Sequence, residues 1–178
     1  MKLILISGKA QHGKDSTANM LKEKLEKQNK KVLIAHYGDL VKYVCKTFFD
    51  WNGEKDEAGR TLLQQIGTNK IRAAHPNFWV DFVKSILNIF YYEWDYVLIP
   101  DTRFPNEIDA YKRDSEYWDL VSVRVNRTNF ESTLSKEQQE HISEIALDYY
   151  KFDYYLDAVD LKELEILVDR LVERLEEK

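Results

Sequence analysis

The stretch that decides the fold runs from Leu3-Ile-Leu-Ile-Ser7 into Gly8-Lys-Ala-Gln-His-Gly13-Lys14-Asp15-Ser16-Thr17. Its second half has the spacing Gly-x-x-x-x-Gly-Lys that is typical of a phosphate-binding loop, or P-loop. The glycines let successive backbone N–H groups turn toward one anion, and a helix predicted over Lys14–Gln28 points its positive end at the same place. The apolar run before the loop indicates a buried strand. We therefore predict that this loop binds the phosphates of a nucleotide.

Within this loop, Lys14 is expected to reach the terminal phosphates. The next residue is Asp15, where the frame usually has a Ser or Thr whose hydroxyl binds magnesium. Asp15 could bind the metal, Ser16 could do so after a small shift, or Asp15 could only complement the helix dipole. The residues expected to contact the nucleotide are Gly8, Lys9, Ala10, Gln11, His12, Gly13, Lys14, Asp15, Ser16 and Thr17.

A second acidic position follows the apolar run Tyr96-Val-Leu-Ile-Pro-Asp101. An apolar strand that ends in an aspartate is typical of the Walker B strand, whose carboxylate orients the magnesium ion. Asp101 joins Asp15 and Ser16 as a candidate magnesium ligand. Arg103 lies two residues further on, so in an extended chain both side chains would project to one side. A structural salt bridge or a helix cap is the alternative explanation for this pair.

The length and composition of the chain restrict the class of protein. The chain has 178 residues, 44% hydrophobic and 32% charged, and a net charge of −5. These values predict one globular domain and argue against a protein that coats nucleic acid or an anionic membrane. The single cysteine, Cys45, excludes an intramolecular disulfide and suggests a buried thiol in a reducing compartment. No membrane span, signal peptide or zinc spacing is evident, so we expect a cytoplasmic protein.

Short apolar runs alternate with longer amphipathic stretches, which predicts an α/β fold with a parallel sheet covered on both faces. The expected strands are Leu3–Ser7, Val32–Tyr37, Tyr96–Ile99, Leu120–Val125 and Tyr154–Val159. The expected helices are Lys14–Gln28, Asp39–Phe49, Arg60–Ala74, Phe78–Tyr91, Asn106–Lys112, His141–Tyr149 and Leu161–Leu175. The helix at Phe78–Tyr91 should carry an apolar stripe of Phe82, Ile86, Ile89 and Phe90. Thr128–Gln139 should be a polar loop. In such folds ligands bind beyond the carboxyl ends of the strands.

The arginines indicate what kind of acceptor a P-loop enzyme of this size would use. Six of the eight arginines lie between positions 60 and 127. An alcohol acceptor usually needs a carboxylate to take its proton, whereas a phosphate acceptor needs cations that hold two anions together. The arginine cluster favours a phosphate acceptor.

These residues resemble the phage-type deoxynucleoside monophosphate kinases, within the P-loop nucleoside monophosphate kinase superfamily. The resemblance spans most of the chain and is carried, in order, by Gly13-Lys-Asp-Ser-Thr17, Arg60-Thr-Leu-Leu-Gln-Gln-Ile-Gly-Thr68, Arg72 with Phe78-Trp-Val80, Asp101-Thr-Arg-Phe-Pro-Asn-Glu107 and His141-Ile-Ser-Glu144. Asp after the P-loop lysine is normal in this group.

The resemblance implies a three-layer α/β/α kinase with a five-stranded, mainly parallel sheet. Residues 1–50, 93–127 and 141–178 would form the core, 51–92 a helical monophosphate-binding arm and 126–141 a lid. ATP and Mg²⁺ would be the cofactors, and a (deoxy)nucleoside monophosphate would receive the phosphoryl group. The implied catalytic residues are Lys14, Asp101, Arg103 and Arg127, with Arg124 on ATP. The implied acceptor-binding residues are Asp39, Lys42, Arg60, Gln64, Gln65, Gly67, Thr68, Arg72, Trp79, Arg103 and Glu144. His141 and Ser143 receive no role.

Plainer explanations stay open for several of these residues. Trp79 could pack in the core, Gln64 and Gln65 could be solvated, and His141 with Glu144 could form a surface pair. Two rival functions also stay open: another small P-loop metabolite kinase of the phosphomevalonate type, and a nucleotide-binding switch without transferase activity. Partners are expected to be small-molecule nucleotides, with no nucleic acid polymer and no membrane, in a monomer or a homodimer.

Overall fold

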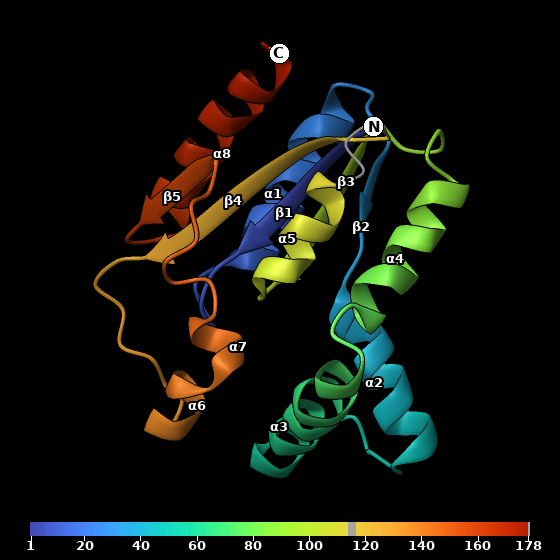
Figure 1. The fold of residues 1–178 in the computed structure, drawn as a ribbon. Coiled ribbons are helices and arrows are strands. Elements are labelled where there is room, and N and C mark those ends of the chain that lie inside the picture. The colour runs from blue at the N-terminus through green and yellow to red at the C-terminus, as the bar shows by residue number, and fades with distance from the viewer. Residues whose placement is uncertain (114–116, 178) are drawn as a thin grey trace.

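The computed structural model describes residues 1–113 and 117–177 and places a five-stranded sheet at the centre (Figure 1). The strands are β1 (Lys2–Ser7), β2 (Val32–Ile34), β3 (Tyr96–Thr102), β4 (Asp119–Arg127) and β5 (Tyr154–Ala158). Their order across the sheet is β2-β3-β1-β4-β5, and every neighbouring pair is parallel. The predicted α/β fold with a five-stranded parallel sheet is confirmed. Because β1 is the central strand, the loop that follows it begins at the middle of the sheet edge.

Helices cover both faces of this sheet. They are α1 (Lys14–Lys27), α2 (Tyr37–Phe48), α3 (Glu57–Gln64), the π-helix η1 (Gln65–Arg72), α4 (Phe78–Ile89), α5 (Pro105–Lys112), α6 (Lys136–Glu140), α7 (Ile142–Ile145) and α8 (Leu161–Glu176). Ile4 and Ile6 pack in the core with α1 and α8, whereas Leu3 and Leu5 pack in the core on the other face with α2, α4 and α5. Alternate residues of a strand point to opposite faces, which explains this division.

Several predicted boundaries are wrong. The second strand ends at Ile34 rather than at Tyr37, because Tyr37 already begins α2. The third strand continues past Ile99 to Thr102, where it still pairs with Ser7 of β1. The helix expected at Arg60–Ala74 starts earlier and becomes a π-helix after Gln64. As a result Asp101 belongs to a strand, and the arm helix changes its winding beside the predicted site.

The predicted apolar stripe on α4 is also wrong. Phe82, Ile86, Ile89 and Phe90 are all partly exposed, whereas the buried residues of this helix are Trp79, Val80 and Leu87. Both sets recur at helical spacing, so periodicity alone could not decide which face points to the sheet.

Between β4 and β5 the expected loop contains the short helix α6, and the expected helix at His141–Tyr149 is only the four residues of α7. Cys45 is buried, as predicted. Within residues 1–113 and 117–177, no helix combines the length and the apolar character needed to cross a membrane. The division into core, arm and lid stays a prediction.

Candidate active site

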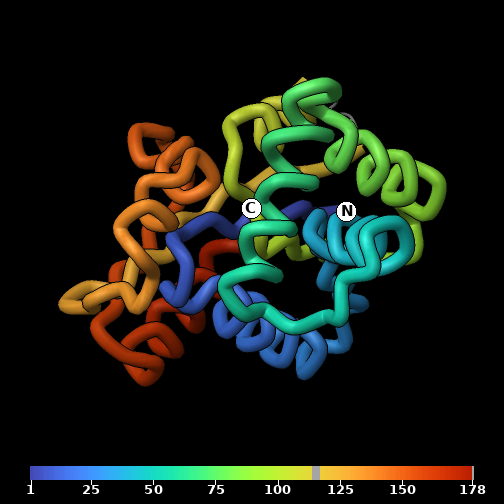
Figure 2. Tube along the Cα trace, turned by 90° about the horizontal axis from the view of Figure 1, so that it is seen from below, coloured from blue at the N-terminus to red at the C-terminus, as the bar shows by residue number. Residues whose placement is uncertain are grey.

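At the carboxyl ends of the strands lies a cavity of about 730 Å³. Seen from this end, the P-loop lies between the α3–η1 arm and the segment that carries α6 and α7 (Figure 2). The predicted site residues that line the cavity are Ala10, Gln11, Lys14, Asp15, Lys42, Arg60, Gln64, Gly67, Thr68, Arg72, Trp79, Asp101, Arg103 and Glu144. The structure therefore brings the glycine loop, the acid of β3 and three of the mid-chain arginines to one site.

The P-loop owes its path to two glycines. Gly13 has a φ of 93°, a left-handed conformation that favours glycine. A Cβ atom at Gly8 would lie 2.5 Å from the carbonyl oxygen of Val125, so only glycine fits beside β4. The loop thus turns tightly against the sheet and delivers the first residue of α1, Lys14, to the cavity.

Lys14 is nearly buried, and its Nζ donates a 2.8 Å hydrogen bond to the carbonyl of Lys9. Burial lowers the pKa of Lys14 to about 8, and the positive charge of Arg103 acts in the same direction. The charges of Asp15 and Asp101 oppose this shift, so both carboxylates act on the ammonium group. An anionic ligand would restore the full charge of the lysine.

Asp101 joins the end of β3 to the start of α2. Its Oδ1 accepts a hydrogen bond from the Tyr37 N–H at 3.1 Å, and its Oδ2 accepts one from the Gly38 N–H at 2.7 Å. Burial raises the pKa of Asp101, although the hydrogen bond from Gly38 opposes this effect. The carboxylate is therefore fixed by the helix N-terminus while it lines the cavity.

Asp15 is exposed and lies beside His36, with 3.3 Å between Asp15 Oδ1 and His36 Nε2. This hydrogen bond lowers the pKa of Asp15 and raises that of His36. Among the described residues, no group of three or more acidic, histidine or cysteine side chains could hold a metal ion. Magnesium that binds with nucleotide phosphates takes only one or two protein carboxylates, so Asp15 and Asp101 fit that mode of binding.

The arm side of the cavity contains a buried ion pair between Arg72 and Glu107. Arg72 NH2 lies 2.6 Å from Glu107 Oε1, and the Arg72 guanidinium stacks over the Phe104 ring at 4.1 Å. Glu107 Oε2 also accepts hydrogen bonds from the N–H groups of Arg103 and Phe104. Burial raises the pKa of Glu107, and the charge of Arg72 opposes this. Arg72 Nε is buried and has no hydrogen-bond partner within the described part of the chain.

In the sequence, Glu107 is the last residue of the motif Asp101–Glu107, which alone assigns it no role. Its position does give a local signal. A glutamate at the third position of a helix commonly accepts a hydrogen bond from the backbone N–H of the residue that precedes the helix, and Glu107 is the third residue of α5.

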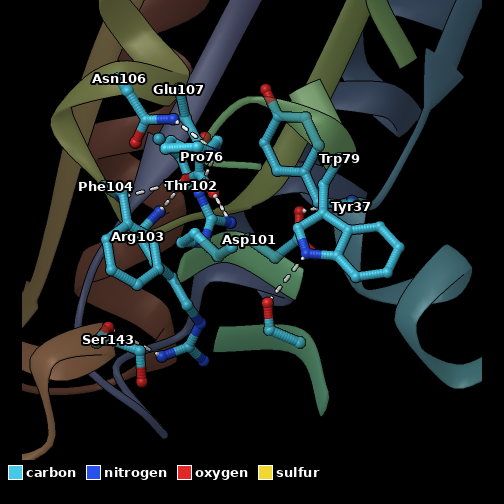
Figure 3. Close-up of polar contacts among 12 residues, drawn as sticks. Tyr37, Pro76, Trp79, Asp101, Thr102, Arg103, Phe104, Asn106, Glu107 and Ser143 are labelled. Carbon is cyan, nitrogen blue, oxygen red and sulfur yellow. Dashed lines mark hydrogen bonds and ion pairs between the residues drawn. The ribbon is translucent and has the colours of Figure 1, made fainter. Parts of the chain in front are cut away.

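Four side chains of the arm face the cavity at intervals of four residues: Arg60, Gln64, Thr68 and Arg72. Gln65 is exposed and does not line the cavity. Trp79 is buried, and its Nε1 donates a 3.0 Å hydrogen bond to the carbonyl of Gly67 (Figure 3). Trp79 therefore packs beneath the arm, and only part of it borders the cavity.

Several predicted residues do not line the cavity: Gly8, Lys9, His12, Gly13, Ser16, Thr17, Asp39, Gln65, Arg124 and Arg127. Arg124 is buried under the P-loop, where it donates to Ser7 Oγ and pairs with Asp148 at 2.8 Å. Arg127 is exposed, with its guanidinium 4.3 Å from the centre of the Phe130 ring. Residues that sequence reasoning did not place in the site but that line it include His36, Phe104, Glu107 and Leu134.

Glu144 of α7 reaches across to the P-loop. Its Oε2 accepts a 2.7 Å hydrogen bond from the Ala10 N–H, and its Oε1 pairs with the guanidinium of Arg103. Arg103 NH1 also donates to the carbonyl of Ser143 at 3.2 Å (Figure 3). The alternative of a surface pair between His141 and Glu144 is therefore wrong. Glu144 pairs with Arg103, and His141 Nδ1 lies 2.8 Å from Ser143 Oγ.

Comparison with known proteins agrees with this architecture. No protein-family model matches the sequence, and no curated protein matches it. Among solved structures, shikimate kinase from Aquifex aeolicus is similar over 98% of this chain and 96% of its own, with 13% identity and a TM-score of 0.57. The Mycobacterium tuberculosis APS kinase CysC, solved in complex with AMPPNP and APS, covers 98% of this chain and 97% of its own, with 11% identity and a TM-score of 0.54. The chain therefore has the fold of small P-loop kinases.

Proposed function

We propose that this protein is a magnesium-dependent kinase that transfers the γ-phosphoryl group of ATP to a (deoxy)nucleoside 5′-monophosphate, giving the diphosphate and ADP. The observation that carries the proposal is the composition of one cavity. Its P-loop wall contributes Lys14, its sheet edge contributes Asp101 and Arg103, and its arm contributes Arg72. The cations come from three separate elements, so they can neutralise the charge of two phosphate-bearing ligands that meet in this cavity.

In this proposal the P-loop amides and Lys14 hold the donor phosphates, and Asp15 and Asp101 hold magnesium directly or through water. Magnesium would neutralise charge on the phosphate oxygens. Arg103 would face the transferred group, since it leaves the end of β3 between the P-loop and α7. The APS kinase with the same fold was solved with AMPPNP, which supports an ATP-like donor.

The acceptor assignment depends on the arm. Arg72 lines the cavity, and its side chain keeps 12% of its surface exposed, so the exposed part of its guanidinium can bind an acceptor phosphate. Gln64 and Thr68 lie further along the same face, where an amide and a hydroxyl can pair with a base. The acceptors named for the two structural neighbours, APS and shikimate, differ, so fold likeness leaves the acceptor open.

The experiment is a magnesium-ATP coupled assay of ADP release with each deoxy- and ribonucleoside monophosphate, and with phosphomevalonate as a rival acceptor. Mass spectrometry identifies the product. The expected result is acceptor-dependent ADP release and formation of a nucleoside diphosphate, both absent in Lys14→Met. Transfer to phosphomevalonate alone would favour the rival kinase. Tight ATP binding without acceptor-stimulated turnover would favour a nucleotide-dependent switch.

A further inference from the structure

The chain supplies its own anion to the phosphate loop. The Glu144 side chain is only 7% exposed, and its two carboxylate oxygens are divided between the Ala10 N–H and the Arg103 guanidinium. An amide of the P-loop and an arginine at the end of β3 are the kinds of donor that bind a phosphate oxygen. In this structure both donors are already satisfied by a carboxylate.

The ammonium group of Lys14 also has a hydrogen-bond partner within the protein. Its Nζ bonds to the carbonyl of Lys9, within the loop itself. The Glu144 charge also acts on the lysine, because it opposes the lowering of the Lys14 pKa. The carboxylate of Glu144 thus binds the Ala10 N–H and the Arg103 guanidinium directly, and its charge also acts on Lys14. A phosphate that bound these groups would meet a like charge at very short range, which is strongly unfavourable.

We propose that Glu144 is an internal anion that occupies the phosphate site and withdraws when the phosphates of a nucleotide bind. The proposal rests on the proposed donor site but not on the identity of the acceptor. In this proposal the Glu144 carboxylate competes with the phosphates of the donor nucleotide for the same site. It therefore acts as a brake, in that it lowers the affinity of the enzyme for the nucleotide.

The position of Glu144 links this brake to the predicted lid. α7 directly follows residues 126–141, and that segment touches the P-loop at two further places. Gln11 Nε2 donates to Thr133 Oγ1 at 2.8 Å, and the Arg127 N–H donates to His12 Nδ1 at 3.1 Å. Positions 10, 11 and 12, three of the four variable positions of the P-loop, thus all contact the lid side. Withdrawal of Glu144 would remove the contact at position 10, the one of the three whose acceptor is a carboxylate, together with the ion pair between Glu144 and Arg103.

The energetic consequence follows from competition. If only the fraction of molecules with a withdrawn carboxylate can bind phosphate, the apparent affinity falls by that fraction. Neutralising Glu144 should therefore tighten the binding of a polyphosphate. A different role, in which Glu144 stays in place and orients Arg103 for transfer, predicts the opposite, since its loss would then weaken binding or turnover.

The test measures binding of inorganic tripolyphosphate by calorimetry to the wild type, to Glu144→Gln and to Glu140→Gln. Glu140 is the matched control: the same charge is removed four residues away, from an exposed side chain whose ion pair with Lys136 is 3.9 Å long. We expect Glu144→Gln to lower the Kd about threefold to tenfold, as removal of a competing charged contact predicts, and Glu140→Gln to leave it unchanged. An unchanged or higher Kd in Glu144→Gln overturns the proposal.

A measurement on the wild type avoids any doubt about the folding of the variant. Hydrogen exchange of the α7 amides is followed with and without tripolyphosphate. Withdrawal of Glu144 predicts faster exchange in α7 when the anion binds, whereas slower or equal exchange overturns the proposal. If tripolyphosphate displaces Glu144 but no nucleoside monophosphate is phosphorylated, the proposed acceptor is wrong and the internal anion stands.

Discussion

Removal of the Arg72 guanidinium should destabilise the fold as well as the acceptor site. Arg72 pairs with Glu107 at 2.6 Å, and the two side chains are only 12% and 1% exposed. Leaving one member of a buried pair without its partner costs about 3–5 kcal/mol. Two backbone N–H groups still bind Glu107 when the arginine is gone, so we expect Arg72→Met to lose about 3 kcal/mol, the low end of that range.

The assay is urea unfolding of Arg72→Met, Glu107→Gln and the double variant. In the double variant no buried carboxylate is left unpaired, so we expect recovery of about 1–2 kcal/mol of the loss in Arg72→Met. The pH dependence gives a second check. Burial raises the pKa of Glu107 in the folded state, and without Arg72 it should rise further. The loss in Arg72→Met should therefore shrink as the pH falls toward the unfolded pKa, because protonation then favours the folded state.

The same double variant separates stability from binding. Because part of its stability is restored, a higher KM for the acceptor with an unchanged Kd for an ATP analogue would assign Arg72 to the acceptor. Additive effects of the two single variants, or a loss below about 1 kcal/mol in Arg72→Met, would refute the reasoning about a coupled buried pair. Equal weakening of donor and acceptor would place Arg72 on both ligands.

Three further predictions concern the P-loop and the wall beneath the arm. Lys14→Met should lower turnover at least about a thousandfold without a change in the circular dichroism spectrum, and near-normal turnover would contradict the P-loop assignment. Since burial lowers the pKa of Lys14 to about 8, the Kd of an ATP analogue should rise with pH above 8 in the wild type and less steeply in Lys14→Met, as titration calorimetry from pH 7 to 9.5 would show. Trp79→Phe removes the hydrogen bond to Gly67 and should cost about 1–2 kcal/mol in urea unfolding while the acceptor KM stays constant; a large rise in KM would instead place the indole on the base.

The sheet and the P-loop could be predicted from the sequence because both are encoded locally. The apolar strand at Leu3–Ser7 and the spacing of the glycines need no distant partner to be recognised. The end of the second strand is different. The N–H groups of Tyr37 and Gly38 bind Asp101, which lies 64 and 63 residues away, and this contact begins α2 earlier than the local pattern suggests. Boundaries set by such contacts are not visible in a window of neighbouring residues.

The predicted residues at the end of one strand line the cavity together, whereas those on a helix face do so only in part. Asp101 and Arg103 both line the cavity, as their placement at the end of a strand predicted. Gln64 and Gln65 are adjacent on the arm, and only Gln64 faces the cavity. Arg124 is buried against Ser7 and Asp148, because β4 is covered on both faces and residues 121–125 are all buried. An arginine count shows that cations are present, but not where they point.

Glu107 and Glu144 show why the identity of a residue does not reveal whether it moves. Both are acidic and nearly buried, and each pairs with an arginine of the cavity. Glu107 accepts two hydrogen bonds from the backbone that immediately precedes its own helix, so its position is fixed by neighbours in sequence. Glu144 comes from a four-residue helix and reaches partners more than 40 residues away, of which Arg103 is 31% exposed. Withdrawing Glu144 breaks only contacts that a phosphate can replace, whereas withdrawing Glu107 would also break the start of α5. The carboxylate of Glu144 can therefore act as a displaceable anion, and that of Glu107 cannot.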